Sequence, residues 1–282
     1  MKLATHSDVF SKKFISIDSV REKASSCFTS TSLHKGTSKY MFIYTPDVLT
    51  DLALIGWLPV DAYQVSPKKE ENVGFQKHFI KLRNEKYFIG TKDNIEMIPE
   101  LLLINSYDAK CSFKFYVTLY RVASESAIVM KSDRLLNESG EEKMKLSHKG
   151  EKLTEYFDDL VKSFDENVAT AIELMNEMSS MELTDKQQKT FAQLCCRARW
   201  DYRYELQNTN SILDPWREED EKSDLLTVSY KLQEKLIKGG WVGAGGRAIK
   251  PIKDPNRELG INHKLFTIIE DYYQDLAKLK KN

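Results

Sequence analysis

The spacing of apolar positions changes along the chain and divides it into regions. Residues 1–38 are rich in Ser, Thr and Lys with little periodicity, so we expect a flexible N-terminal arm with a short helix near residues 19–24. Residues 39–131 alternate apolar and polar positions, which is typical of strands. Residues 132–149 form a polar, charged connector, and residues 150–282 follow a helical period.

The alternating region predicts an antiparallel sheet of about five strands, preceded by one early helix. A short β-like run at residues 40–44 leads into that helix, for which Thr45 is the expected N-cap and Pro46 the first helical residue. Gly56 is expected to end the helix. The predicted strands are residues 61–65, 76–83, 96–105, 112–121 and 126–131.

The remainder of the chain predicts helices. Residues 150–180 carry one apolar stripe, which indicates a long amphipathic helix that packs on the core or forms an oligomer seam. Thr184 is the expected N-cap of a helix over residues 185–199. An amphipathic helix, a glycine-rich basic loop and a closing helix follow over residues 223–273. The fold class is therefore α+β, with the sheet first and a mostly helical C-terminal half, in two domains or in one.

Two predicted strands place cationic and aromatic side chains on one face. Single-stranded nucleic acid binding needs such a surface, because cations meet phosphates and flat rings stack on bases. The alternative is a solvated sheet face whose lysines extend their stems over apolar surface. The candidate contacts are Lys77, Phe79, Lys81, Arg83, Lys114, Tyr116 and Tyr120.

The glycine-rich loop at residues 239–253 presents Arg247, Lys250 and Lys253. It follows a helix and lacks the terminal Lys-Ser/Thr of a phosphate-binding loop, so it does not indicate a nucleotide site. A flexible loop that carries cations to a nucleic-acid backbone is one interpretation. The other is a surface loop whose glycines only end the preceding helix.

Composition limits the function classes. Lys+Arg and Asp+Glu both total 42, so the net charge is zero and a uniformly basic surface is excluded. The four cysteines show no CxxC spacing, which favours reduced thiols over a disulfide framework or a zinc site. No signal peptide or membrane span is indicated. We expect a cytoplasmic protein that does not enter the membrane.

Catalytic motifs are absent from the sequence. The histidines are scattered, and an acid/base pair of His78 and Asp108 would lack a nucleophile or metal partner. The acidic run at residues 218–221 is expected to be a solvated face and not a metal site. The sequence therefore predicts no catalytic residue, no metal and no cofactor, and it favours a non-enzymatic role.

Several segments resemble the phage- and plasmid-borne family catalogued as domain of unknown function 932, over roughly residues 40–276. Residues 224–240 (DLLTVSYKLQEKLIKGG) resemble the family's DLWTVFNRVQENLIRGG segment, and residues 100–108 (ELLLINSYD) resemble EIVLINSHDGS. Residues 75–83, 247–252 and 261–266 are similar to further family segments. The positions that match these motifs are Asn105, Ser106, Asp108, Gln233, Glu234, Gly239, Gly240, Arg247 and Asn262.

The chain also departs from the family pattern. Tyr107 and Ala109 replace the histidine and glycine of the SHDG segment, and residues 123–126 (ASES) replace a CSNG turn. If those positions carried chemistry in the family, this chain has altered it.

The resemblance implies an accessory protein of mobile genetic elements that handles DNA or interferes with host defence. We expect non-enzymatic binding of nucleic acid, with single-stranded DNA favoured, for annealing or protection. The alternative is an inhibitor that binds a host restriction or immune complex through protein contacts. In either role we expect a homo-oligomer.

Overall fold

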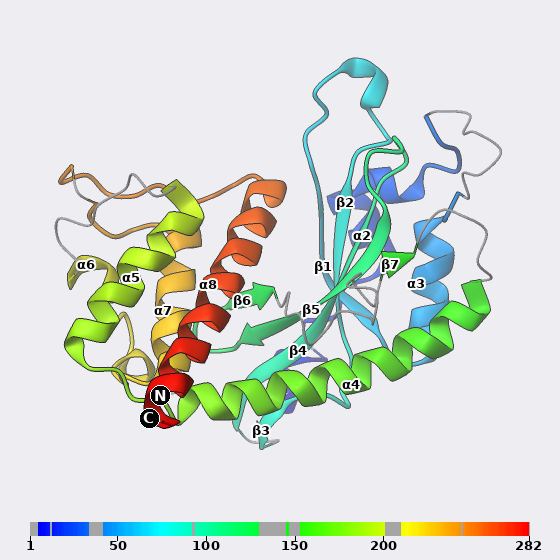
Figure 1. Ribbon diagram of the computed structural model, residues 1–282. Helices are drawn as coiled ribbons and strands as arrows, with labels where there is room; N and C mark the ends of the chain where they lie inside the picture. Colours follow the sequence, from blue (N-terminus) through cyan, green and yellow to red (C-terminus); the bar gives the residue numbers. More distant parts are fainter. Residues whose placement is uncertain are drawn as a thin grey trace. The chain divides into compact units, whose positions relative to one another are not determined.

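The computed structural model divides into two compact units (Figure 1). The first unit comprises Met1–Val122 and Leu135–Val168, and the second comprises Ala123–Arg134 and Ala169–Asn282. The structure describes residues 5–11, 13–33, 42–91, 94–129, 145–146, 153–200, 210–243 and 245–281. The predicted connector at residues 132–149 lies outside the described residues, apart from Lys145–Leu146.

The first unit is built on an antiparallel sheet. The central strands are paired in the order β1-β2-β4-β5, and β3 pairs with β4 while β7 pairs with β5. Their bounds are β1 (Leu58–Gln64), β2 (His78–Arg83), β3 (Ile89–Thr91), β4 (Asn94–Asn105), β5 (Phe113–Arg121) and β7 (Lys145–Leu146). Strand β6 (Ser126–Val129) follows a turn after β5. Each predicted strand is therefore present and the α+β fold class is confirmed; the short strands β3 and β7 were not predicted.

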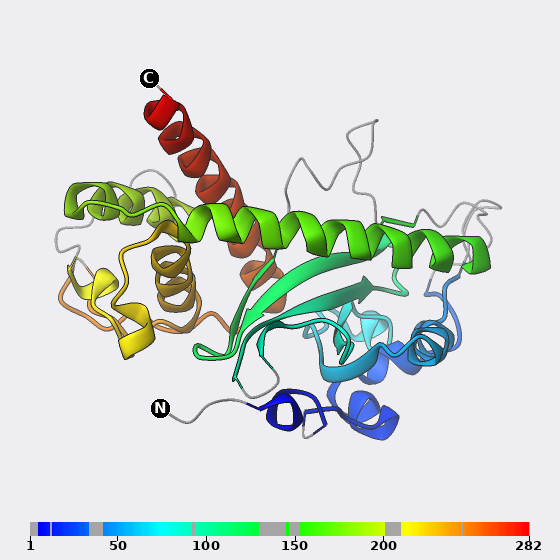
Figure 2. The same cartoon turned by 90° about the horizontal axis from the view of Figure 1, so that it is seen from below.

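Helices lie on both sides of these strands. Figure 2 shows the sheet between the long helix α4 (Leu153–Ser179) and the N-terminal helices. In the first half of α4, the Phe164 ring packs edge-on against Trp57 and Tyr87, with ring centroids 4.4 and 5.1 Å away. On the N-terminal side, Phe10 joins Ile98 in a buried apolar cluster. Both faces of the sheet are thus covered over much of their length.

The segment predicted as an arm contains more structure than the expected short helix. It forms α1 (His6–Val9), α2 (Ile17–Lys23) and the 3-10 helix η1 (Ser25–Phe28), whereas residues 34–38 lie outside the described part. Phe10, Val20 and Cys27 are buried. Three short elements, each with one or two buried residues, leave no extended period in the sequence, which explains why the pattern gave no sign of them.

The early helix α3 (Thr45–Leu54) begins one residue earlier than predicted, since Tyr44 is its N-cap and Thr45 is already helical. Residues 42–44 are not a strand, which corrects the prediction for that part of residues 40–44; residues 40 and 41 are not described. Gly56 ends the helix as predicted, with a φ of 86° that favours glycine.

The second unit is organised around one buried helix, α7 (Leu225–Lys238). Asp224 caps its start by accepting from the Thr227 amide at 2.9 Å, and Gly239 ends it. Its neighbours are α5 (Asp185–Trp200), α6 (Asn210–Leu213), the 3-10 helix η4 (Glu218–Asp220), α8 (Pro255–Lys281) and β6. The predicted amphipathic helix is present, but its polar side is buried as well, because the charged side chains there find partners.

Candidate nucleic-acid interface

Three lysines on one face of the sheet lie over aromatic rings. The Nζ atoms of Lys77, Lys81 and Lys114 lie 5.2, 5.7 and 5.4 Å from the ring centroids of Phe79, Tyr63 and Tyr116. Strand alternation puts Lys77 and Lys81 on the same face, and the pairing of β2 with β4 and of β4 with β5 adds Lys114. All three lysines are half-buried. We call Lys77, Lys81 and Lys114 the lysine face.

Two of the three rings below the lysine face are not accessible to a ligand, and the third, Tyr63, is half-buried. The exposed fraction of Phe79 is 0% and that of Tyr116 is 5%, so neither ring can stack on a base. This corrects the prediction for both residues. The alternating pattern suggested a wet face, but neighbouring side chains and the lysine stems cover the rings.

Arg83 is also withdrawn from the surface. Its Nε atom donates to Glu100 Oε1 at 2.8 Å, and its Nη1 atom donates to the Val9 carbonyl at 2.7 Å. The guanidinium lies 4.2 Å from the centroid of the half-buried Tyr120 ring. Arg83 therefore stabilises the contact between the sheet and the N-terminal helices and does not face a phosphate.

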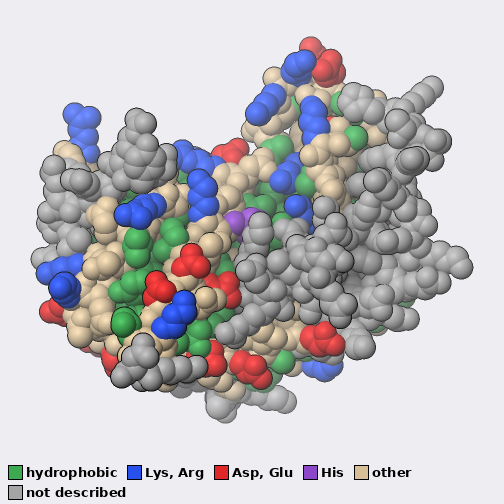
Figure 3. All heavy atoms as spheres, viewed as in Figure 1, with side chains coloured by type: hydrophobic (Ala, Val, Ile, Leu, Met, Phe, Trp, Pro, Cys, Tyr) green, Lys and Arg blue, Asp and Glu red, His purple; other side chains and the backbone are tan. Residues whose placement is uncertain are grey.

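In Figure 3, Lys and Arg side chains lie along the upper part of the strands on the face in view.

A neutral polar cluster lies between the sheet and α3. His78 is fully buried; its Nε2 atom is 2.8 Å from Thr45 Oγ1, and its Nδ1 atom is 3.2 Å from the Gln76 carbonyl. A carbonyl only accepts, so we assign the proton to Nδ1 and the acceptor role to Nε2. Burial lowers the pKa of His78 to about 4. The ring is therefore neutral at pH 7.

The motif residues at the end of β4 and directly after it belong to the same cluster. Asn105 Nδ2 donates to Thr45 Oγ1 at 3.1 Å and to the Ile43 carbonyl at 3.0 Å, and Asn105 Oδ1 accepts from the Ser106 amide at 2.8 Å. The Tyr107 hydroxyl donates to the Cys27 carbonyl and accepts from the Thr45 amide, both at 2.8 Å. Burial raises the pKa of the Tyr107 hydroxyl. These groups hold η1, α3 and β4 together.

Asp108 takes no part in this cluster. Its Oδ1 atom accepts from the Lys110 amide at 3.1 Å, and its Oδ2 atom is 3.7 Å from Lys110 Nζ. The contacts of His78 are with Thr45, Ser26 and Gln76. The hypothesis of a His78–Asp108 acid/base pair is therefore wrong, because the histidine is buried away from solvent and the aspartate stabilises a turn.

Two departures from the family pattern fall on turns with unusual backbone geometry. Ala109, in place of the family's glycine, has a φ of 58°, and Glu125, in the replaced CSNG turn, has a φ of 46°. L-residues adopt this left-handed region at a cost, and glycine or asparagine adopts it readily. The family residues at these two positions are therefore explained by backbone geometry and need no chemical role.

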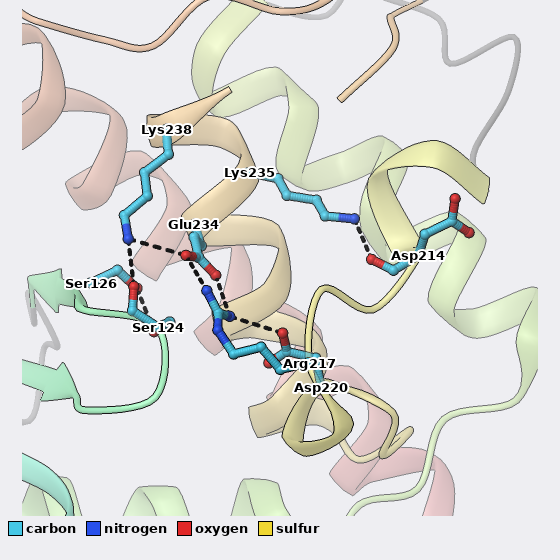
Figure 4. A network of polar contacts seen from close by, with 8 residues as sticks. All are labelled: Ser124, Ser126, Asp214, Arg217, Asp220, Glu234, Lys235 and Lys238. Atoms are coloured by element: carbon cyan, nitrogen blue, oxygen red, sulfur yellow. Dashed lines mark hydrogen bonds and ion pairs between the residues drawn. The ribbon is translucent and has the colours of Figure 1, made fainter. Parts of the chain in front are cut away.

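An ionic network lies in the second unit (Figure 4). Arg217 donates to both carboxylate oxygens of Glu234, at 2.7 and 2.6 Å, and to Asp220 Oδ2 at 2.9 Å. Lys238 Nζ approaches Glu234 Oε1 at 3.1 Å and donates to the Ser124 carbonyl. Asp220 has an exposed fraction of 1%. The prediction that residues 218–221 form a solvated face is therefore wrong at Asp220.

Lys235, next to Glu234 in α7, extends into the protein. Its exposed fraction is 1%, and its Nζ atom donates to the carbonyls of Ser211 and Asp214. The same atom lies 5.1 Å from the centroid of the Trp216 ring. Burial lowers the pKa of Lys235 to about 8. Glu234 and Lys235 together fix both ends of the segment from Asp214 to Arg217 on α7.

The remaining motif residues of the second unit connect its elements. Gln233 Nε2 donates to the Ala127 carbonyl at 2.9 Å and to Asn262 Oδ1 at 3.1 Å, and Asn262 Nδ2 donates to the Glu258 carbonyl at 3.1 Å. Gln233 and Asn262 thereby join α7 to β6 and α8. The sequence motif identified these positions, but their roles are structural contacts.

The loop after α7 has a fixed base and an exposed tip. The Gly240 amide donates to the Ile249 carbonyl, and the Ile249 amide donates to the Trp241 carbonyl, both at 2.8 Å. Gly239 has a φ of 70°, and an added Cβ would lie 2.2 Å from the Ile249 carbonyl oxygen, so no other residue fits there. The predicted basic residues Arg247, Lys250 and Lys253 are all exposed. This confirms that the loop presents its cations to solvent.

Sequence reasoning assigned no individual role to Arg217 and Lys235, and it considered Trp216 only as the start of an acidic run, residues 216–221, that could contact a basic host surface. Trp216 is 43% exposed, and in the sequence it stands beside an acidic run that drew attention to charge alone. The available signal was a tryptophan in a polar segment, since such a residue is either an anchor of the core or a contact for a ligand.

In the part of the chain that the structure describes, no group of His, Cys, Asp and Glu side chains could hold a metal ion. No helix among the described residues has the length and apolar character needed to cross a membrane.

The fold and the site define an α+β protein with one cationic surface in each unit, which is the lysine face in the first unit and the glycine-rich loop in the second. Residues 33–265 match the model of the family described as "Domain of unknown function (DUF932)", and the chain belongs to that family. It is 26% identical to the UPF0380 protein YafZ of Escherichia coli (strain K12) over 252 residues, which cover 87% of this chain and 86% of that protein. It is also 26% identical to the UPF0380 protein YfjQ of the same organism over 251 residues, with the same coverage. No solved structure matches.

Proposed function

We propose that this protein binds single-stranded nucleic acid without catalysing a reaction, and that the lysine face contacts the phosphates. The observation that carries the proposal is the placement of Lys77, Lys81 and Lys114 on one sheet face, each over an aromatic ring. A ring below a lysine restrains its stem. Ordered cations on a flat surface suit a flexible chain of phosphates.

Geometry also limits the kind of contact that this face makes. Lys77 and Lys81 are four residues apart along one strand, which corresponds to about 13 Å, and Lys114 lies two strands away on β5, at about 12 Å from each of them by the ordinary spacing of strands and residues. Phe79 and Tyr116 are buried and Tyr63 is half-buried, so the face offers a ligand mainly charge and no open ring for base stacking. Binding through it should therefore be independent of sequence and strongly dependent on salt.

The test is a fluorescence-polarisation titration of the full chain with a labelled single-stranded DNA and the matching duplex at several salt concentrations. The triple variant Lys77→Gln/Lys81→Gln/Lys114→Gln should bind more weakly, and its salt slope should be shallower by about 2, from about 0.7 for each lost contact to a single strand. Lys186→Gln/Lys189→Gln/Lys222→Gln is the matched control, because it removes the same charge from exposed lysines of the second unit.

Two results would contradict the proposal. If the wild-type chain binds no nucleic acid at low salt, the function is wrong, and inhibition of a host defence complex becomes the hypothesis to test. If the control triple variant loses as much affinity as the lysine-face variant, the effect is one of net charge and the sheet is not the interface.

A further inference from the structure

The second unit carries a surface that differs from the lysine face in one respect, since its aromatic ring is exposed. Trp216 is 43% exposed and Val242 is 48% exposed. A Cβ added to Gly240 would lie 3.6 Å from the Trp216 ring, so the glycine backbone borders the indole. The bridge between Val242 and Ala248 then places the exposed Arg247 and Lys250 on the returning strand of the same loop.

Contacts on both sides hold Trp216 at the surface. The Asp214 carbonyl accepts from Lys235 Nζ, and the Arg217 guanidinium is bound by both oxygens of Glu234. The Asp214 backbone and the Arg217 side chain are thus bound to α7, and the segment between them holds the indole at the surface. Lys235 Nζ lies 5.1 Å from the ring centroid and is buried. The protein therefore occupies one side of the ring with a cation and leaves the other side to solvent.

The exposed groups define the chemistry of a ligand. An open indole binds a flat, apolar or aromatic group, and the neighbouring cations require that the ligand also carries negative charge. The bases and phosphates of single-stranded nucleic acid supply both. A duplex does not, because its bases are stacked on each other, so that only its phosphates and the base edges in its grooves are available and no base face is open to the indole.

We propose that Trp216 stacks on an unpaired base while Arg247 and Lys250 contact the adjacent phosphates. The inference rests on the proposed function and deepens it, because it assigns the preference for single strands to one residue of the second unit. The phosphates bound by the lysine face would be shared by single strands and duplexes, whereas the Trp216 contact requires an unpaired base.

The experiment compares three probes with the full chain: an oligothymidylate, an abasic strand of the same length, and a duplex. The wild-type chain should bind the oligothymidylate about 5- to 150-fold more tightly than the abasic strand, the range expected for one stacked base. Trp216→Leu should abolish this difference without changing affinity for the abasic strand or the duplex. Trp216→Phe should keep most of it, because a flat ring remains.

A second readout is tryptophan emission, compared between the wild type and Trp216→Leu because the chain contains four tryptophans. Stacking on a base quenches indole fluorescence, so the oligothymidylate should quench the emission of the wild-type chain and the abasic strand should not. Leu54→Ala is the control for loss of an exposed apolar side chain, since Leu54 is 82% exposed in the first unit. It should behave as the wild type with every probe.

The outcomes separate this inference from the proposed function. Equal affinity of the wild type for the oligothymidylate and the abasic strand, or an unchanged ratio in Trp216→Leu, would overturn the Trp216 assignment and leave phosphate binding by the lysine face intact. Absence of binding to all three probes would overturn both.

Discussion

Lysine and aromatic side chains meet in both units of this protein, but their order from the core to the surface is reversed. In the first unit Phe79 is fully buried and Lys77 extends over it to the surface. In the second unit Lys235 is buried and Trp216 lies outside it. The outer group decides what a ligand meets, which is charge on the sheet and an aromatic ring beside the glycine loop.

The reversal has a physical origin in the two backbones. On a strand, every second residue shares a face, so Lys77 and Phe79 come from one strand and the shorter, apolar side chain packs inward. Trp216 comes from an irregular segment bound to α7, and Lys235 of this helix extends from the core side of the ring to the Asp214 carbonyl. A buried lysine requires acceptors, and the carbonyls of Ser211 and Asp214 supply them.

The largest expected effect is the difference between the Phe79 and Trp216 rings in their contribution to the free energy of unfolding. Phe79→Ala should lower the free energy of unfolding by about 3–5 kcal/mol, because it leaves a cavity in the core. Trp216→Ala should cost clearly less, because 43% of this residue is already exposed in the folded protein. Urea unfolding followed by circular dichroism measures both changes. Similar losses of stability in the two variants would show that Trp216 is as deeply buried as Phe79.

The next prediction concerns the network that holds Trp216 outside. Glu234→Gln should lower the free energy of unfolding by about 3 kcal/mol, near the low end for a broken buried ion pair because the Arg217 side chain is 25% exposed. The same variant should reduce the preference for oligothymidylate over the abasic strand, since Arg217 no longer fixes the segment that carries Trp216.

The matched control for that variant is Glu221→Gln, an exposed carboxylate in the same region. It should change neither stability nor base preference. If Glu234→Gln is as stable as the wild type, the network contributes little, and the position of Trp216 must depend on Gly240 and the carbonyl contacts of Lys235 instead.

Much of the fold could be predicted from local patterns. Strand alternation located β1, β2, β4, β5 and β6, and helical periodicity located α4, α5 and α7, because these signals depend on neighbours in sequence. The glycine loop was also recognisable, since Gly239 and Gly240 follow directly after the apolar stripe of α7. The exposed cations of that loop followed from the same observation.

The pairs that decide the candidate site could not be predicted in this way. Arg83 and Glu100 are 17 residues apart, and so are Arg217 and Glu234, and no local period connects residues at that separation. Arg83 therefore looked like a free surface cation, and the acidic run beside Arg217 looked solvated. Side-chain pairing across elements determines burial here, and a sequence pattern shows only which face a residue occupies.

The last prediction is that low pH destabilises the first unit, which contains His78, more than the second unit. The pKa of His78 is about 4 in the folded protein and 6.5 as its ordinary value, so below pH 6.5 the unfolded chain binds a proton that the folded chain does not. Stability is therefore full above pH 6.5 and falls as the pH decreases toward 4. The expected loss at pH 5 relative to pH 8 is about 2 kcal/mol.

The neutral variant His78→Gln isolates this effect, because its amide can donate and accept but does not titrate. Hydrogen exchange of the buried Ile80 and Leu103 amides should lose protection at pH 5 in the wild type, after correction for intrinsic rates, and that pH dependence should be absent in the variant. The amide of Leu232 in α7 reports on the second unit and serves as the internal reference. An identical pH dependence in wild type and variant would mean that His78 keeps its ordinary pKa in the folded state, which a fully buried ring that donates to the Gln76 carbonyl and accepts from Thr45 should not do.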